Sequence, residues 1–163
     1  MIPMEVAGVR VELPANTPMV VLREQDGRHR LLPIMIGSPE ASAIHNALEG
    51  IVPQRPLTHD LVVNLFEALG AQLDSVVVTE VREHTFYAEL HLRTAAGELV
   101  VSSRPSDALA LAVRTGTPIF ANEDLLDEAA LDAPDEIAEQ EEEAILDEFR
   151  DFLEEIKPED FEA

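Results

Sequence analysis

The order of secondary-structure signals in this chain repeats once, and this repetition limits the folds that the chain can adopt. Two helix starts marked by Pro39 and Pro105 lie 66 residues apart, and Asp60 and Asp124, in later helix starts, lie 64 residues apart. Three strand patterns precede the first helix start of each copy. A unit of three strands and two helices therefore occurs twice, which is too few copies for a solenoid and predicts a compact, pseudo-symmetric domain.

Alternation of hydrophobic and polar residues predicts the strands, and helical periodicity predicts the helices. The first copy is expected to contain strands at residues 4–13, 19–23 and 30–36 and helices at about 38–49 and 59–69. The second copy is expected to contain strands at residues 75–81, 85–92 and 98–102, a helix at 105–114 and a short helix from Asn122. Runs of strands followed by helices predict an α+β fold, a duplicated three-strand/two-helix unit with a mainly antiparallel sheet.

The expected core is aliphatic, because only 4% of the residues are aromatic. In the first helix, Ile44, Leu48 and Ile51 are spaced to face inward. The second helix carries Leu61, Leu65, Phe66 and Leu69 at helical spacing.

The formal net charge of −22 is concentrated at one end of the chain. Residues 122–163 contain 19 of the 33 acidic residues, with only Arg150 and Lys157 as cations. A turn at residues 132–135 separates the two parts, so we expect a domain at 1–131 and an acidic tail at 132–163. The tail carries a helical stripe of apolar residues, which predicts an amphipathic helix. That stripe consists of Ile145, Phe149, Phe152, Leu153 and Ile156.

The chain contains no cysteine, so it has neither disulfides nor thiolate metal sites. Its first residues do not have the basic and apolar regions of a signal peptide, and no uncharged run approaches about 18 residues. The sequence therefore predicts a cytoplasmic protein that does not span a membrane.

Two short motifs place polar groups at helix starts. One covers residues 55–60 and the other residues 104–107, and each has an Arg-Pro pair followed within four residues by a hydroxyl and an aspartate. The amides and dipole of a helix N-terminus favour negative charge, so each motif can hold its own aspartate or an external anion.

The chain resembles the bifunctional nuclease domain family over roughly residues 1–131. The resemblance rests on the order of four segments, with Met35 as a departure where an aromatic residue is often found. These segments are residues 32–41, 55–61, 104–108 and 117–120. The resemblance implies a nuclease that hydrolyses phosphodiester bonds in DNA and RNA with little sequence specificity.

A nuclease site of this kind needs carboxylates, a proton acceptor and cations for phosphate. The candidate catalytic residues are His59, Asp60 and Asp107. The candidate phosphate ligands are Arg55, Arg104, Thr58 and Ser106. The candidate ligands of a divalent cation, Mg²⁺ or Mn²⁺, are Glu40, Asp60 and Asp107.

Each of these residues also has a purely structural interpretation. Asp60 and Asp107 stabilise a helix from its first turn, and Thr58 is a good N-cap. An Arg–Asp pair that ties a loop to a helix explains both arginines. His59 follows no capping rule, and a lone histidine at a helix start is most often simply exposed.

Two functions therefore remain open at the level of sequence. The first is a nuclease with nucleic acid as its partner, which the arginine motifs favour. The alternative is a non-catalytic oligomeric regulatory module that binds an anion or a partner, which the overall acidity favours because nucleic-acid binders usually present a basic face. In both cases we expect a homo-oligomer.

Overall fold

The computed structural model describes residues 1–133, which contain seven strands and four helices. The first copy consists of β1 (Ile2–Glu12), β2 (Thr17–Glu24), β3 (Leu31–Met35), α1 (Ser38–Leu48) and α2 (Thr58–Ala68). The second copy consists of β4 (Gln72–Arg82), β5 (Thr85–Thr94), β6 (Gly97–Ser103), α3 (Pro105–Thr115), β7 (Ile119–Ala121) and α4 (Glu123–Ala129). Residues Met1–Asp132 form one compact unit. The amphipathic helix expected in the acidic tail lies outside the described residues.

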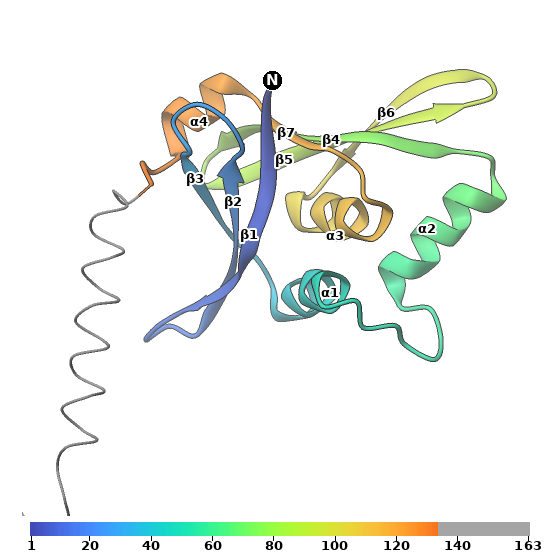
Figure 1. Ribbon diagram of the computed structural model, residues 1–163, viewed down its shortest axis with the longest axis horizontal. Helices are drawn as coiled ribbons and strands as arrows, with labels where there is room; N and C mark the ends of the chain where they lie inside the picture. Colours follow the sequence, from blue (N-terminus) through green and yellow to red (C-terminus); the bar gives the residue numbers. More distant parts are fainter. Residues whose placement is uncertain (134–163) are drawn as a thin grey trace, which may run out of the picture. The chain divides into compact units, whose positions relative to one another are not determined.

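All seven strands belong to one sheet, in the order β3-β2-β1-β7-β4-β5-β6. Each copy supplies an antiparallel three-strand meander, and β7 lies between the two meanders (Figure 1). All neighbours are antiparallel except β4 and β7, which are parallel. The α+β fold with a duplicated unit and a mainly antiparallel sheet is therefore confirmed. The sequence did not predict β7, because three residues are too few to show an alternating pattern.

Helix α3 is the central helix of the layer that packs on the sheet. It contacts α1 and α2 on its sides and β4 and β5 on the sheet (Figure 1). Every residue from Ala108 to Ala112 is buried, and three of these five residues are alanines that allow a close approach to the neighbouring elements. The buried hydrophobic residues of the described part of the chain include no aromatic side chain, as the low aromatic content predicted.

Helix α2 lies at the margin of this layer and exposes one side. Leu61 is 51% exposed, Leu65 48% and Leu69 78%, whereas Val62 and Val63 pack against the core. The inward orientation expected for α1 is correct for Ile44, which is fully buried, and wrong for Leu48 and Ile51. Helix α1 ends at Leu48, so Ile51 belongs to the following loop and does not continue the helical face.

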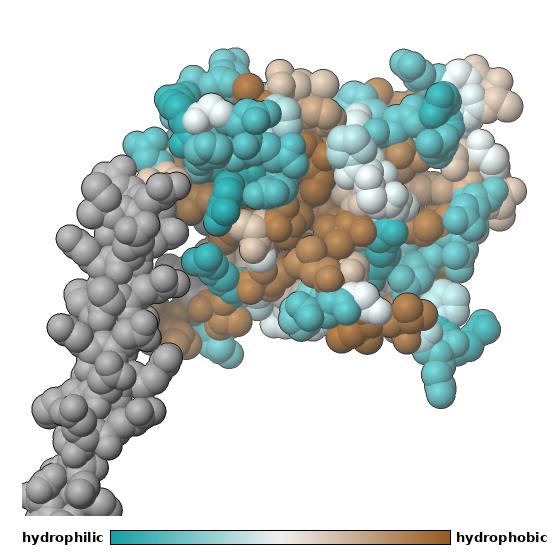
Figure 2. Space-filling view, in the orientation of Figure 1, coloured by the Kyte–Doolittle hydropathy of each residue, from teal (hydrophilic) through white to brown (hydrophobic). Residues whose placement is uncertain are grey.

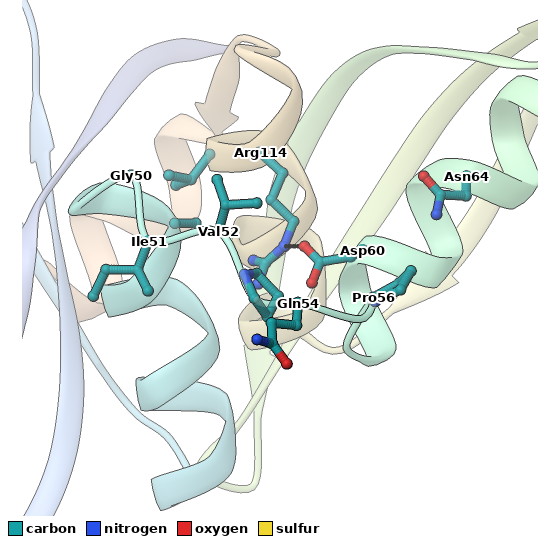
Figure 3. A pocket seen from close by; sticks show the side chains of 11 residues that line it. Gly50, Ile51, Val52, Gln54, Pro56, Asp60, Asn64 and Arg114 are labelled. Atoms are coloured by element: carbon teal, nitrogen blue, oxygen red, sulfur yellow. Dashed lines mark hydrogen bonds and ion pairs between the residues drawn. The ribbon is translucent and has the colours of Figure 1, made fainter.

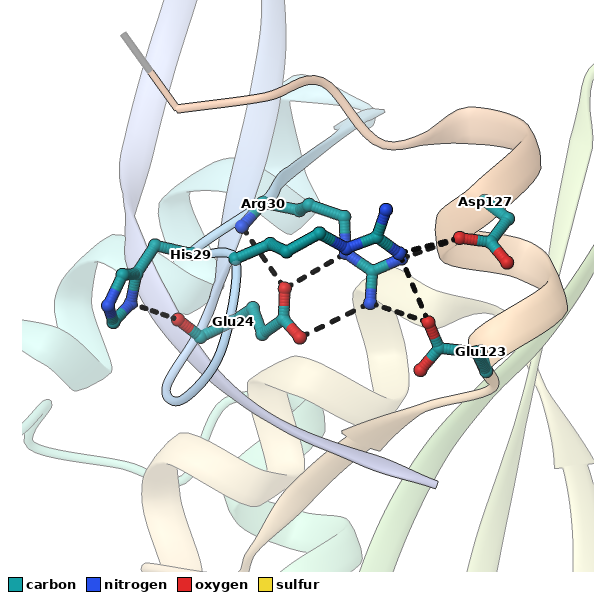
Figure 4. Close-up of polar contacts among 6 residues, drawn as sticks. Glu24, His29, Arg30, Glu123 and Asp127 are labelled. Carbon is teal, nitrogen blue, oxygen red and sulfur yellow. Dashed lines mark hydrogen bonds and ion pairs between the residues drawn. The ribbon is translucent and has the colours of Figure 1, made fainter. Parts of the chain in front are cut away.

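A buried arginine fixes α4 to the β2–β3 hairpin (Figure 4). Arg30 is 3% exposed, and its Nε donates a hydrogen bond of 2.9 Å to Glu24 Oε2. Its two terminal nitrogens donate bonds of 2.9 Å to Glu123 Oε1 and to Asp127 Oδ1 of α4. The hydrogen bond from Arg30 lowers the pKa of Glu24 although burial opposes this shift. Part of the acidity that follows residue 122 thus compensates a buried cation.

Hydrophobic side chains gather in the middle of the face shown in Figure 2, between β1 and the helices α1 and α3. A mainly apolar cavity of about 570 Å³ lies in this region, lined by the first residues of β1, by Leu48 of α1 and by the segment from α3 to β7. No charged side chain of α1 or α3 lines it. Within residues 1–133, no helix is both long and apolar enough to cross a membrane.

The different burial of α1 and α2 predicts different costs for truncating their apolar side chains. We expect Ile44→Ala to lower the free energy of unfolding by about 2–5 kcal/mol, because the side chain is fully buried and leaves a cavity. Leu65→Ala, at a half-exposed position of α2, should cost less than about 1 kcal/mol. Urea unfolding followed by circular dichroism measures both values. A cost for Leu65→Ala equal to that for Ile44→Ala contradicts the position of α2.

Candidate functional site

The N-termini of three helices each carry an acidic residue at the third helical position. These residues are Glu40 in α1, Asp60 in α2 and Asp107 in α3. The residue before each helix has an extended backbone, and its side chain does not cap the helix in α1 or α3. An acid in the first turn compensates the positive end of the helix dipole in all three cases. The three carboxylates nevertheless have different partners.

One network joins the N-termini of all three helices. His59 of α2 lies 2.9 Å from Asp107 of α3, measured between Nε2 and Oδ1. Arg104, directly before α3, donates from Nε to Asp107 Oδ2 at 2.7 Å and from Nη2 to Glu40 Oε1 of α1 at 3.0 Å. The sequence predicted Glu40, His59, Asp107 and Arg104 as candidates, and the structure brings all four together. We call this group the Arg104 network.

Asp107 and Arg104 stabilise each other's charged forms in this network. Partial burial disfavours the charged form of Asp107, but the hydrogen bonds from Arg104 and His59 outweigh it and lower the pKa of the carboxyl. The hydrogen bonds to Asp107 and Glu40 raise the pKa of Arg104. Asp107 is therefore a carboxylate at neutral pH, and it orients the His59 ring by accepting a hydrogen bond from Nε2.

Arg104 lies at the surface, so its guanidinium can reach a ligand. Its side chain is 63% exposed, whereas that of Glu40 is 19% exposed and that of His59 13%. Its Nη1 donates to no protein group in residues 1–133. Gly37 makes room for Glu40, because a Cβ at this position would collide with Glu40 Oε2. The partly buried carboxylates of Glu40 and Asp107 thus hold a cation that presents one free edge to solvent.

Asp60 belongs to a different contact (Figure 3). Its Oδ1 accepts a hydrogen bond of 2.8 Å from Nε of Arg114 in α3, and its Oδ2 accepts one of 2.9 Å from the amide of Leu57. These two hydrogen bonds lower the pKa of Asp60. Arg114 Nη1 also donates to the carbonyl of Ala43 in α1, so one arginine connects three helices.

The Asp60–Arg114 pair lines a cavity of about 490 Å³ between the end of α1, the loop that follows it, α2 and α3 (Figure 3). Both charged groups are already paired, and the Arg114 side chain is only 11% exposed. This arrangement supports the structural interpretation of Asp60, as a residue that holds α2 in place. The sequence did not single out Arg114, although it lies seven residues after Asp107 and so on the same side of α3.

The remaining candidate residues, Arg55, Thr58 and Ser106, lie in different surroundings. Arg55 is exposed and has no ion pair within the described part of the chain. Thr58 is the first residue of α2, so the N-cap position belongs to Leu57 and not to Thr58. Ser106 is 6% exposed and lies in the first turn of α3, directly beside the Arg104 network.

The acidic candidates do not form a metal site as they are arranged. Arg104 occupies Glu40 and Asp107, and Arg114 occupies Asp60. No group of three or more His, Asp or Glu side chains in residues 1–133 could hold a metal ion. For Mg²⁺ or Mn²⁺ to bind Glu40 or Asp107, Arg104 would have to release that carboxylate.

Comparison with known sequences gives two kinds of relatives. The sequence model described as the bifunctional nuclease domain matches residues 20–134. An uncharacterized protein of Mycobacterium tuberculosis is 44% identical over 162 residues, which covers 97% of this chain and 96% of that protein.

Plant proteins match over a shorter part. Bifunctional nuclease 1 of Arabidopsis thaliana is 32% identical over 111 residues, which covers 66% of this chain and 34% of that protein. Bifunctional nuclease 2 of Oryza sativa subsp. japonica is 29% identical over 122 residues, which covers 72% of this chain and 37% of that protein. The matched region thus spans only about a third of the plant proteins.

The contact between Asp60 and Arg114 predicts an acid-sensitive contribution to stability. Asp60→Asn should lower the free energy of unfolding at pH 7 by about 1–3 kcal/mol, because it leaves a mostly buried guanidinium without its counter-charge. The folded-state pKa of Asp60 is lowered, so this contribution is complete above the ordinary value of 3.8 and is lost as the pH falls through the folded-state pKa. Urea unfolding of wild type and variant at pH 7 and at several values below pH 5 measures it.

Asp74→Asn is the matched control. Asp74 pairs with Arg93 at 2.9 Å, but the Arg93 side chain is 56% exposed. Water screens this pair, so its removal should cost less than about 1 kcal/mol. Equal losses in the two variants, or an effect of Asp60→Asn that grows on acidification, contradict the structural role of Asp60.

Proposed function

The chain belongs to the bifunctional nuclease domain family, and on this premise we propose that it hydrolyses phosphodiester bonds of DNA and RNA at the Arg104 network. The observation that carries this proposal is the 2.9 Å contact of His59 with Asp107, next to an exposed arginine that both Asp107 and Glu40 hold in place. This combination supplies a proton acceptor and a fixed positive charge at one point of the surface. Both assist the attack of water on a phosphodiester.

The proposed roles follow from which atoms are free. Arg104 Nη1 contacts a non-bridging oxygen of the phosphate and stabilises the charge that develops there. Asp107 accepts the hydrogen bond from His59 Nε2, which leaves Nδ1 as the proton acceptor. Water attacks the phosphorus, its proton passes to Nδ1, and the bond to the leaving oxygen breaks. The leaving oxygen keeps the electron pair and takes a proton from solvent.

Glu40 has a positioning role in this scheme. It holds the terminal nitrogen Nη2 of Arg104, so the guanidinium cannot rotate freely toward solvent. Two carboxylates around one arginine leave the network without net positive charge, which limits unspecific attraction to nucleic acid. All of the proposed contacts are to phosphate and none is to a base edge, so little sequence preference is expected from the network.

The exposed side of α2 favours a second candidate function, that of an oligomeric or partner-binding module. Leu57, Leu61, Leu65 and Leu69 lie four residues apart and form a row in which each side chain is about half exposed or more. A contiguous apolar surface of this kind is typical of a protein contact. We infer self-association through this leucine row, which is compatible with nuclease activity.

The nuclease proposal predicts a loss of cleavage in variants of the network. With labelled single-stranded DNA and RNA, His59→Ala and Arg104→Ala should each reduce the rate at least about 100-fold, equivalent to roughly 2.7 kcal/mol of transition-state stabilisation. His45→Ala and Arg93→Ala are matched controls, because both residues are exposed and lie outside the network. The assay is run with Mg²⁺ and with EDTA. Equal cleavage by all proteins indicates a contaminating nuclease and contradicts the proposal.

The second candidate function predicts that the chain self-associates and that a charged residue in the leucine row prevents this association. Sedimentation velocity of the full chain at ionic strengths of about 0.15 M should show an oligomer, and Leu65→Glu should shift it to the monomer. Glu67→Gln, on a different side of the same helix, should leave the oligomer intact. A monomeric wild-type protein, or an oligomer that survives Leu65→Glu, excludes this surface as the contact.

A further inference from the structure

A cavity of about 430 Å³ opens on the other side of Arg104. It lies between the N-termini of α1 and α3, the end of β3 and the turn from β4 to β5. Gly37, Arg104 and Ser106 give its lining a polar part, and Met35 and Phe86 give it an apolar part. None of the residues among 1–133 that line it is acidic, in contrast to the network beside it. Its volume lies in the range of small-molecule sites.

The polar part has the features of an oxyanion site. Ser106 is 6% exposed, and its hydroxyl forms no hydrogen bond with another group in residues 1–133 although it lines the cavity. The amides of Ser106 and Asp107 have no acceptor within the helix, and the residue before α3 provides no side-chain cap. The Ser106 hydroxyl can therefore donate to a ligand in the cavity. Together with Arg104, these donors fit a phosphate group.

The apolar part has the features of a site for a flat ring. Phe86 is partly buried in β5, on the face of the sheet that also carries the buried Ala88 and Leu90. Met35 is 49% exposed at the end of β3 and lines the same cavity. An aromatic side chain and a flexible thioether in one cavity can contact a nucleobase without selecting its identity.

The turn between β4 and β5 is strained, and it brings a histidine to this cavity. Glu83 has a φ of 49° and His84 a φ of 62°, where L side chains are disfavoured and glycine is preferred. His84 is exposed and lines the cavity. A two-residue hairpin turn of type I′ requires positive φ at both central residues, and this turn places His84 at the cavity.

We propose that this cavity binds one unpaired nucleotide, with its phosphate at Ser106, Arg104 and the α3 amides and its base against Phe86 and Met35. The inference rests on the proposed function, because it places this nucleotide next to the phosphodiester that is cleaved at the Arg104 network. A base in a duplex is paired and stacked and cannot enter. The substrate class is therefore single-stranded nucleic acid, or the frayed end of a duplex.

Isothermal titration calorimetry of the full chain tests this proposal with three probes: adenosine 5′-monophosphate, adenosine and inorganic phosphate. We expect the monophosphate to bind at least about tenfold more tightly than adenosine or phosphate alone, because only the monophosphate contacts both parts of the lining. Ser106→Ala should weaken the binding of the monophosphate and of phosphate at least about tenfold. Phe86→Leu should weaken the monophosphate and leave phosphate unchanged. Ser42→Ala, an exposed serine of α1, is the control and should change neither.

His84→Gly is included because it changes the cavity without destabilising the fold. Glycine relieves the positive φ, so this variant should melt at the same or a higher temperature than wild type. Because the His84 side chain lines the cavity and contacts the bound nucleotide in this proposal, its removal should weaken binding of the monophosphate. Equal affinities for the monophosphate and phosphate, or monophosphate affinities that Phe86→Leu and His84→Gly leave unchanged, overturn the proposal.

The same protein samples separate this inference from the proposed function. If cleavage depends on His59 but the affinity for the nucleotide does not change in the Ser106 and Phe86 variants, the nucleotide site is overturned and the nuclease proposal stands. Nucleotide binding with the expected dependence, in a protein that cleaves nothing, overturns the nuclease proposal and leaves a nucleotide-binding module.

Discussion

The contacts made by the two ends of α3 determine how the helical layer of this domain is arranged. Arg114 at its C-terminal end binds the carboxylate of Asp60 in α2 and the carbonyl of Ala43 in α1. Arg104 and Asp107 at its N-terminal end bind Glu40 in α1 and His59 in α2. Because α3 is buried between these helices and the sheet, both sets of contacts share one rigid support. The convergence of three helix N-termini follows from this arrangement.

One sequence feature, an acid in the first turn of each of these helices, serves two purposes here. Asp60 pairs with a mostly buried arginine and with a backbone amide, and so it stabilises the packing of α2. Glu40 and Asp107 hold an exposed arginine in a defined orientation. A structural role in helix packing explains the first case. In the second case it leaves unexplained why an exposed guanidinium is fixed by two carboxylates beside a histidine.

The sequence predicted the repeated unit and most element boundaries because strand alternation, helix periodicity and Pro or Gly signals are local properties. It also named Glu40, His59, Arg104 and Asp107, because polar residues at helix starts follow local rules. It could not show which of these residues meet, nor that Asp60 would find Arg114, because these contacts depend on how α1, α2 and α3 pack. The exposure of Leu61 and Leu65 was hidden for the same reason, since a marginal helix and a central helix can share one apolar pattern. The cavity beside Ser106 is lined by a hairpin turn and by two helix ends, and no regular spacing in the sequence connects these segments.

In the proposed mechanism, His59 and Asp107 act as one unit in phosphodiester hydrolysis. A double-mutant cycle tests it most directly, with cleavage rates of a labelled single-stranded RNA measured for wild type, His59→Ala, Asp107→Asn and the double variant. If Asp107 acts in part by orienting His59, the loss of rate in the double variant should be at least about tenfold smaller than the product of the two single losses, because residues that act as a unit are not additive. Losses that multiply in the double variant, or single variants that cleave like wild type, contradict the account.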